Sequence, residues 1–219
     1  MPFFILLCNS KYFYMDKEKY IQDVKEIKDI MVRTTRFVSL SGLSGVATGL
    51  TALVGTFLVY QTVFKDQDYL VYNSVELDSG KLRYLLFFAV GTLILSIGTA
   101  IFFTSRKTKK QNQSGWNSQT RKLLFNLLIP LITGGVLCLI LLFRGFLGML
   151  APLTLIFYGL ALLNGSKYTL SEMKNLGLIQ ILIGLTAFQF IEYGLLFWAL
   201  GFGVVQILYG IIVQIKYKS

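Results

Sequence analysis

The sequence contains no histidine, and only two of its 219 residues are cysteines. Histidine is the commonest general base and metal ligand of proteins, so its absence removes most catalytic triads and the usual zinc and haem sites. Cys8 and Cys138 lie at the N-terminus and deep inside a long apolar run, and we expect no disulfide between them. We therefore expect neither a bound metal nor a cofactor.

Acidic residues are also scarce, with 11 Asp and Glu against 21 Lys and Arg. Paired carboxylates for acid–base catalysis are hard to place, and the chain has no Gly-x-x-x-x-Gly-Lys-Ser/Thr loop for phosphates. Gly42-Leu43-Ser44-Gly45 matches the Gly-x-Ser-Gly pattern of rhomboid proteases, which also have a six-helix core. A serine without a histidine base is a weak nucleophile. We interpret this match as coincidental and predict that the protein is not an enzyme.

Apolar residues, by contrast, make up 54% of the chain and are concentrated in six long runs. An apolar helix needs about 20 residues to cross about 30 Å of hydrocarbon, and five runs reach or approach that length. The fifth run is shorter, but Thr169-Leu170-Ser171-Glu172 has the spacing of a capping box and predicts an earlier helix start. The sequence thus predicts an all-α, polytopic membrane protein with six transmembrane helices. We expect these spans at residues 37–60, 84–104, 123–143, 146–163, 170–191 and 194–213.

The basic residues predict the orientation of these spans. Of the 21 Lys and Arg residues, 17 lie in the N-terminal segment, the second and fourth connections and the C-terminus. By the positive-inside rule we expect both termini to face the cytoplasm, in a multi-pass protein of the bacterial inner (plasma) membrane. The net charge of +10 is explained by this topology and by attraction to anionic lipids. Nucleic-acid binding is not expected, because the basic residues form no reading motif.

The N-terminal region divides into two parts. Residues 1–14 read as a mis-start or a disordered extension, because Met15-Asp16-Lys17-Glu18 is a more ordinary beginning. Residues 15–36 predict a cytoplasmic amphipathic helix, with Tyr20, Val24, Ile27 and Met31 along one stripe. This stripe fits either a helix lying at the membrane interface or a seam with a second copy or a partner.

The predicted spans carry four long amide side chains as candidate functional groups. Polar groups cost free energy in hydrocarbon, so they mark either a pathway for a solute or hydrogen bonds between helices. Convergence of the amides on one cavity would favour the pathway. The four candidates are Asn126, Gln180, Gln189 and Gln206.

Small residues in the first span predict close helix packing. Gly45 and Gly49, continued by Ala52, form a small-xxx-small face that another helix can approach. In the two short outer turns, Arg144 and Glu192 are candidates for an ion pair, although each would also be stable in water.

The inner ends of the second, fourth and sixth spans are alike, since each runs from a glycine and small or apolar residues to a basic residue. Three tandem helical hairpins would explain this similarity. So would the general tendency of helices to end in aromatic and basic residues at the cytoplasmic interface.

The stretch Arg36-Phe37-Val38-Ser39-Leu40-Ser41-Gly42, together with the six-span layout, resembles a family of uncharacterised bacterial integral membrane proteins. The resemblance implies a fold and a membrane, but no activity and no site residues. We expect a non-enzymatic membrane scaffold or regulatory partner that acts through its cytoplasmic face on anionic lipid or a cytoplasmic protein. The alternative is a small-solute transporter or channel subunit with an amide-lined path. Oligomerisation is left open.

Overall fold

The computed structural model describes residues 20–25, 27, 42–64, 79–110, 118–169 and 171–216, and the chain divides into two units, Met1–Phe37 and Val38–Ser219. The predicted extension at 1–14, Met31 and the Arg36–Ser41 part of the family motif lie outside the described residues. In the first unit, residues 20–25 and 27 are helical, and the apolar side chains of Tyr20, Val24 and Ile27 are exposed.

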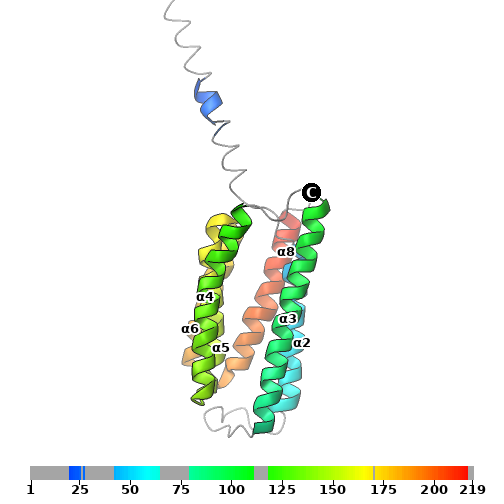
Figure 1. The fold of residues 1–219 in the computed structure, drawn as a ribbon, viewed down its shortest axis with the longest axis vertical. Helices are drawn as coiled ribbons and strands as arrows, with labels where there is room; N and C mark the ends of the chain where they lie inside the picture. The colour runs from blue at the N-terminus through cyan, green and yellow to red at the C-terminus, as the bar shows by residue number, and fades with distance from the viewer. Residues whose placement is uncertain are drawn as a thin grey trace, which may run out of the picture. The chain divides into compact units, whose positions relative to one another are not determined.

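The described part of the second unit consists of helices (Figure 1). The segment from Gly194 to Lys216 is helical throughout but changes type twice, from α to π and back to α. The longer elements are α2 (Gly42–Val59), η1 (Tyr60–Phe64), α3 (Ser79–Lys110), α4 (Ser118–Phe143), α5 (Leu150–Gly165), α6 (Ser171–Gln189), α7 (Gly194–Trp198), η6 (Ala199–Val205) and α8 (Gln206–Lys216). Short 3-10 turns join them at η3 (Leu147–Met149), η4 (Ser166–Tyr168) and η5 (Ile191–Tyr193).

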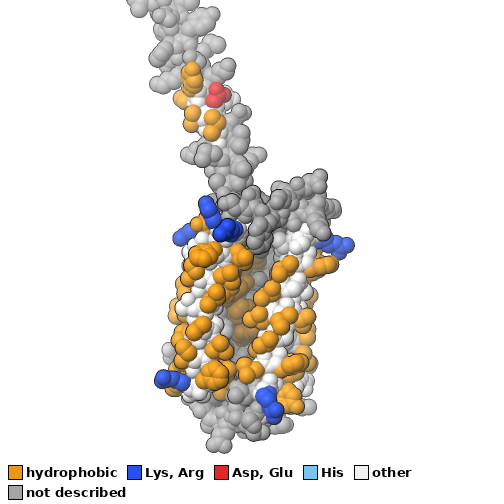
Figure 2. Space-filling view, viewed as in Figure 1, with side chains coloured by type: hydrophobic (Ala, Val, Ile, Leu, Met, Phe, Trp, Pro, Cys, Tyr) orange, Lys and Arg blue, Asp and Glu red, His pale blue; other side chains and the backbone are white. Residues whose placement is uncertain are grey.

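Five of these helical segments are long and apolar enough to cross a membrane, as expected of a multi-pass membrane protein. Apolar side chains cover α3 and α4 along their length, with basic side chains towards the ends (Figure 2). The five segments are Gly42–Thr62, Arg83–Arg106, Thr120–Phe143, Leu147–Tyr168 and Ile191–Lys216. The fifth predicted span, now α6, is not among them, because its 19 residues include Glu172, Lys174 and Gln180.

α3 is longer than the predicted span at 84–104, because it continues from Ser79 to Lys110. The added residues are mostly polar or basic, and they can remain helical while they extend beyond a layer of hydrocarbon. α4 likewise begins at Ser118 rather than at the predicted residue 123.

The turn after α4 depends on glycine. Gly145 has a φ of +82°, a conformation that costs little only without a Cβ atom. The amide of Phe146 donates to the Leu141 carbonyl at 2.9 Å, and the amide of Gly145 donates to that of Leu142 at 3.1 Å. These two bonds are those of a Schellman cap, which satisfies the last carbonyls of α4 and reverses the chain.

Two seams of glycine hold the helices together. α2 packs against α8 and the end of η6, where Gly42 and Gly45 face Gly210 of α8, and Gly49 faces Ile207 of α8 and Gly203 of η6. α5 packs against α6, where Gly159 and Gly177 face each other: a Cβ atom on either would lie 2.6 or 2.8 Å from the carbonyl oxygen of the other. In hydrocarbon, such backbone-to-backbone contact gives dispersion and weak Cα–H···O interactions in place of the hydrophobic effect.

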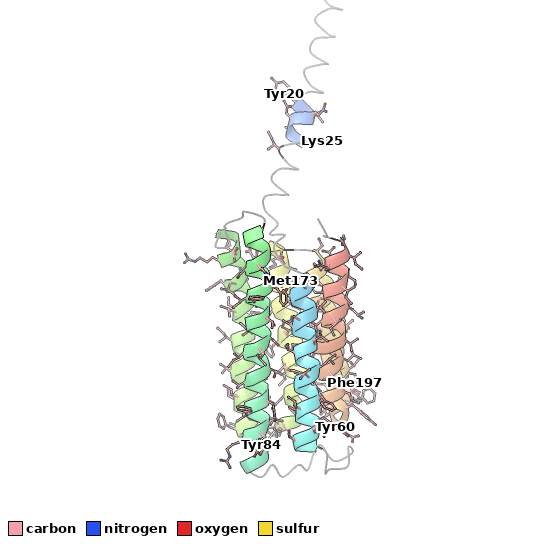
Figure 3. All side chains as sticks on the ribbon, turned by 90° about the vertical axis from the view of Figure 1, so that its right-hand side faces the viewer. Tyr20, Lys25, Tyr60, Tyr84, Met173 and Phe197 are labelled. Carbon is pink, nitrogen blue, oxygen red and sulfur yellow. The ribbon has the colours of Figure 1, made fainter. Side chains whose placement is uncertain are left out.

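The two seams belong to different groups of helices. α2 packs against both α3 and α8, whereas α5 packs against both α4 and α6. The segment from α7 to α8 contacts both groups. A core of Leu162, Met173 and Leu176 lies beside its Val205 and Tyr209. Figure 3 labels Met173 of this core. Consecutive helices α2–α3 and α4–α5 therefore pack as pairs, while the tandem repeat of three hairpins stays a prediction.

Because of the α2–α8 seam, we expect a larger residue to destabilise the protein at Gly210 but not at Gly98. Gly210→Leu should lower the free energy of unfolding by about 1–3 kcal/mol or more, because the new side chain meets the backbone of Gly42 and Val46. Gly98→Leu on α3 is the matched control, since a Cβ atom there has no atom within 4 Å. Thermal unfolding of both variants in detergent measures the difference, and equal unfolding temperatures would contradict the seam.

Candidate functional site

Asn126 lies in α4 one turn before Pro130. Proline has no N–H, so the main-chain carbonyl of Asn126 loses its partner within the helix. Asn164 of α5 replaces it, because its Nδ2 donates to the Asn126 carbonyl oxygen at 3.0 Å. The Asn126 side chain donates to the Lys122 carbonyl of its own helix at 2.8 Å. Both amides are therefore used in hydrogen bonds to backbone.

Gln180 is the second predicted amide and has no exposed surface. Its Nε2 donates at 2.8 Å to the carbonyl oxygen of Gly201, which lies in the π-helical segment η6. Gly201 is needed there, because a Cβ atom would overlap with the side chains of Leu155 and Gln180. The Oε1 atom of Gln180 has no hydrogen-bond partner among the described residues. Gln180 thus joins α6 to an irregular part of its neighbour.

Gln206, at the start of α8, accepts a long hydrogen bond of 3.4 Å from the hydroxyl of Tyr158 on α5. The ring of Tyr158 also packs against Phe202, with 5.0 Å between ring centroids, and Phe202 packs against Trp198 at 4.9 Å. This aromatic group, together with the Gln206 amide, connects α5 to the segment α7–η6–α8.

Gln189, the fourth predicted amide, is exposed at the C-terminal end of α6. The four candidates have different partners: Asn126 bonds within α4, Gln180 bonds to η6, Gln206 bonds to Tyr158, and Gln189 is exposed. No hydrogen bond joins any two of these four side chains.

The predicted packing residues Gly45, Gly49 and Ala52 are all buried on α2. Gly45 and Gly49 lie in the seam with α8 described above. Ser44, the serine of the Gly-x-Ser-Gly pattern, is buried on the same helix at 5% exposure.

Arg144 and Glu192 are both exposed, in the turns that follow α4 and α6, and no ion pair joins them. Charged side chains at such positions keep their hydration, which an exposed pair would have to give up for little gain. An ion pair of 2.5 Å joins Glu172 at the start of α6 to Lys216 at the end of α8. No feature of the sequence indicated this pair.

Exposed basic side chains lie at the end of the helices where α3 ends and α4 begins, in separate groups on either side of that end in the view of Figure 2. Arg106 lies on α3, with its guanidinium carbon 5.8 Å from the centre of the Phe102 ring. The basic residues at this end whose side chains the structure describes are Arg106, Arg121, Lys122, Lys167, Lys174 and Lys216. At the opposite end they are Arg83 and Arg144. We call the set Arg106, Arg121 and Lys122 the basic rim.

No protein-family model matches this chain, and neither does any curated protein or solved structure. The arrangement of its own residues therefore has to carry any functional interpretation. That arrangement is a set of amides that satisfy backbone carbonyls, two glycine seams and a basic rim.

The bond from Asn164 predicts an energetic coupling with Pro130. Asn164→Leu leaves the Asn126 carbonyl without a donor and should cost about 1–3 kcal/mol in the free energy of unfolding. In a Pro130→Ala background the restored N–H serves that carbonyl, so the same substitution should cost less. A double-mutant cycle in detergent measures this coupling. Additive effects of the two substitutions would contradict the proposed compensation.

Because Gln180 is fully buried, we expect the stability of a Gln180→Glu variant to depend on pH. A protonated Gln180→Glu side chain still donates to the Gly201 carbonyl, whereas the ionised form places a charge where no water reaches. The folded variant binds a proton more tightly than the unfolded chain, so its stability falls as pH rises. We expect a loss of about 3 kcal/mol or more at pH 8 and a smaller loss at pH 5.

Gln189→Glu is the matched control, because it makes the same change on the same helix at an exposed position. Its unfolding temperature should change little between the two pH values. An equally small, pH-independent loss for Gln180→Glu would show that water reaches position 180.

Proposed function

We propose that this chain is a non-enzymatic integral protein of the bacterial inner membrane, with six spans and both termini in the cytoplasm. It acts there as a scaffold or regulatory partner through its cytoplasmic face. The bacterial membrane rests on the resemblance of the Arg36–Gly42 stretch, and the orientation rests on the distribution of basic residues.

In this proposal α6, the fifth predicted span, is membrane-spanning in addition to the five segments named above. Its closest packing is against α5, through Gly159, Gly177 and Gly184, and its Gln180 is bonded to η6. A helix that packs one face against α5 and bonds its buried amide to η6 does not need the hydropathy of one facing lipid on all sides, because neighbouring helices satisfy its polar groups.

The observation that carries the proposed role is the use of the intramembrane amides. Asn164, Gln180 and Gln206 make hydrogen bonds between helices, and Asn126 bonds to its own helix. Side chains that hold helices together are not free to line a path for a solute. This supports a structural role in preference to the transporter or channel alternative.

The apolar stripe of the first unit supports a binding role. Tyr20, Val24 and Ile27 are 63, 62 and 58% exposed on one side of a helical segment. Three neighbouring apolar side chains of this size are typical of a helix that binds a groove or a membrane surface.

If the stripe binds a partner protein, polar substitutions in the stripe should weaken that binding. When the full chain is cross-linked in intact bacterial cells and then purified, we expect one cytoplasmic protein to co-purify with it reproducibly. The triple variant Tyr20→Ser, Val24→Ser and Ile27→Ser should reduce that recovery about tenfold or more, since buried apolar anchors dominate such contacts. The measurement is quantitative mass spectrometry of the cross-linked material.

Asp23→Ser combined with Lys25→Ser is the matched control, because both residues belong to the same helical segment but not to the stripe. This variant should retain the partner. Recovery of no reproducible partner by the unmodified chain, or of one that is indifferent to the stripe, would refute the proposed role.

A further inference from the structure

The described helices of the second unit form two groups that share the last helix. α3 packs against α2, α4 and α6 both pack against α5, and no principal contact of α2 or α3 is with α4, α5 or α6. The helix from Gly194 to Lys216 runs obliquely between the two groups (Figure 1). α7 packs on α5, whereas α8 packs far more extensively on α2 than on α6. α8 therefore belongs with α2 and α3, and α7 belongs with α4, α5 and α6.

Each group is held together by close contacts of its own. Both glycine seams lie within a group, since one joins α8 to α2 and the other joins α5 to α6. Hydrogen bonds of 3.0 Å join the remaining pairs, from Asn164 of α5 to the Asn126 carbonyl of α4, and between the hydroxyls of Thr51 on α2 and Ser96 on α3. Backbone contact of this kind leaves packed helices little freedom to separate. We therefore expect each group to behave as one body.

Between the two groups, close packing is found at η6. A Cβ atom on Gly201 would overlap with the Leu155 side chain of α5, and a Cβ atom on Gly203 would overlap with the Leu53 side chain of α2. Two residues of η6 thus touch both groups. The same segment is π-helical, and π-helical turns and glycines are where helices change direction. Close contact with both groups and an irregular backbone together make η6 suitable as a pivot.

Beyond η6, towards the end of α8, the polar contacts between the groups are weaker. Gln206 accepts a hydrogen bond of 3.4 Å from Tyr158, which is long for an O–H donor. Lys216 pairs with Glu172 at the very end of α8, and the two side chains are 60 and 14% exposed. Partly exposed ion pairs contribute little to stability. The apolar contacts in this region are those of the small core described above.

A pivot at η6 and weaker contacts at the far end of α8 define a hinge. We propose that the two groups of helices open and close about η6, and that the pair between Glu172 and Lys216 holds them closed. Opening separates α8 from α6 and exposes Met173, which is buried in the closed structure. Dissolved salt screens a partly exposed pair, so ionic strength regulates the opening. The hinge depends neither on the orientation of the chain in the membrane nor on a partner protein, so it stands or falls separately from the proposed function.

Distances between spin labels test the hinge in the full chain, reconstituted in nanodiscs of phosphatidylglycerol and phosphatidylethanolamine. In a background with Cys8→Ser and Cys138→Ala, the substitutions Lys174→Cys and Ile215→Cys place labels at exposed positions of α6 and α8, in different groups. Pulsed electron paramagnetic resonance should show a longer distance in addition to that of the closed structure. Glu172→Gln should raise the ratio of the longer to the shorter population about two- to fivefold, as expected for a partly exposed ion pair.

Reversal of the two charges distinguishes loss of the pair from a general loosening of the bundle. Lys216→Glu alone should increase the longer population, because two carboxylates then repel each other. Combining it with Glu172→Lys should restore the original distribution, since the charges attract again. Added salt should increase the longer population in the unmodified pair and should have little effect after Glu172→Gln.

Lys167→Gln is the matched control variant, because it removes one charge from an exposed position of η4 outside the pair. It should leave the distances unchanged. Labels introduced by Arg106→Cys on α3 and Ile215→Cys on α8 lie within one group and should report a single distance in every variant.

A single distance between the labels on α6 and α8, changed neither by Glu172→Gln nor by salt, would overturn the hinge. An equal change between the labels within one group would overturn it too, because the groups would then not be bodies. Unchanged unfolding temperatures establish that each variant is folded. The salt titration needs no substitution in the pair, so it tests the hinge even where a pair variant is unstable.

Discussion

Hydrocarbon offers no hydrogen-bond partner, so a chain that crosses it must satisfy every main-chain carbonyl from within. Regular helix meets this constraint by itself, and two of the points where the structure departs from regular helix involve side-chain amides. Pro130 removes a donor from α4, and η6 changes the hydrogen-bonding pattern near Gly201. At both points a side-chain amide from a neighbouring helix, Asn164 or Gln180, supplies the donor. The polar residues of the core are thus distributed according to where the backbone is irregular.

The glycine seams make these hydrogen bonds geometrically accessible. Asn and Gln have short side chains, and they can bond to a neighbour's backbone only if that backbone is close. α5 and α6 approach to backbone contact at Gly159 and Gly177, and Gly201 leaves room for the buried Gln180 amide. Close packing and amide bonding therefore depend on each other, and a larger residue in a seam would also weaken the hydrogen bonds beside it.

Much of the architecture could be predicted from the sequence, because long apolar runs are a direct consequence of bilayer thickness. All-α structure, the membrane and the approximate positions of the helices follow from those runs. The small face of α2 was likewise visible in the spacing of Gly45 and Gly49. The partners of the amides were not, because a hydrogen bond from α5 to α4 depends on how the helices pack. Pro130, four residues after Asn126, was the available signal for Asn164, since it identifies a carbonyl without a helical donor. No comparable signal in the sequence identifies η6, and the pairing of Glu172 with Lys216 joins residues 44 positions apart.

The π-helical segment η6 also sets the rotational relation between the two ends of the last span. Each residue of a π-helix turns the chain through a smaller angle than a residue of an α-helix, since its hydrogen bonds reach one residue further. Seven such residues separate α7, which packs on α5, from α8, whose Gly210 faces α2. If the same residues were α-helical, the faces of α7 and α8 would no longer point to their present neighbours. η6 therefore sets the rotation of α8 relative to α7. Because of it, one continuous helix packs against α5 near one end and against α2 near the other.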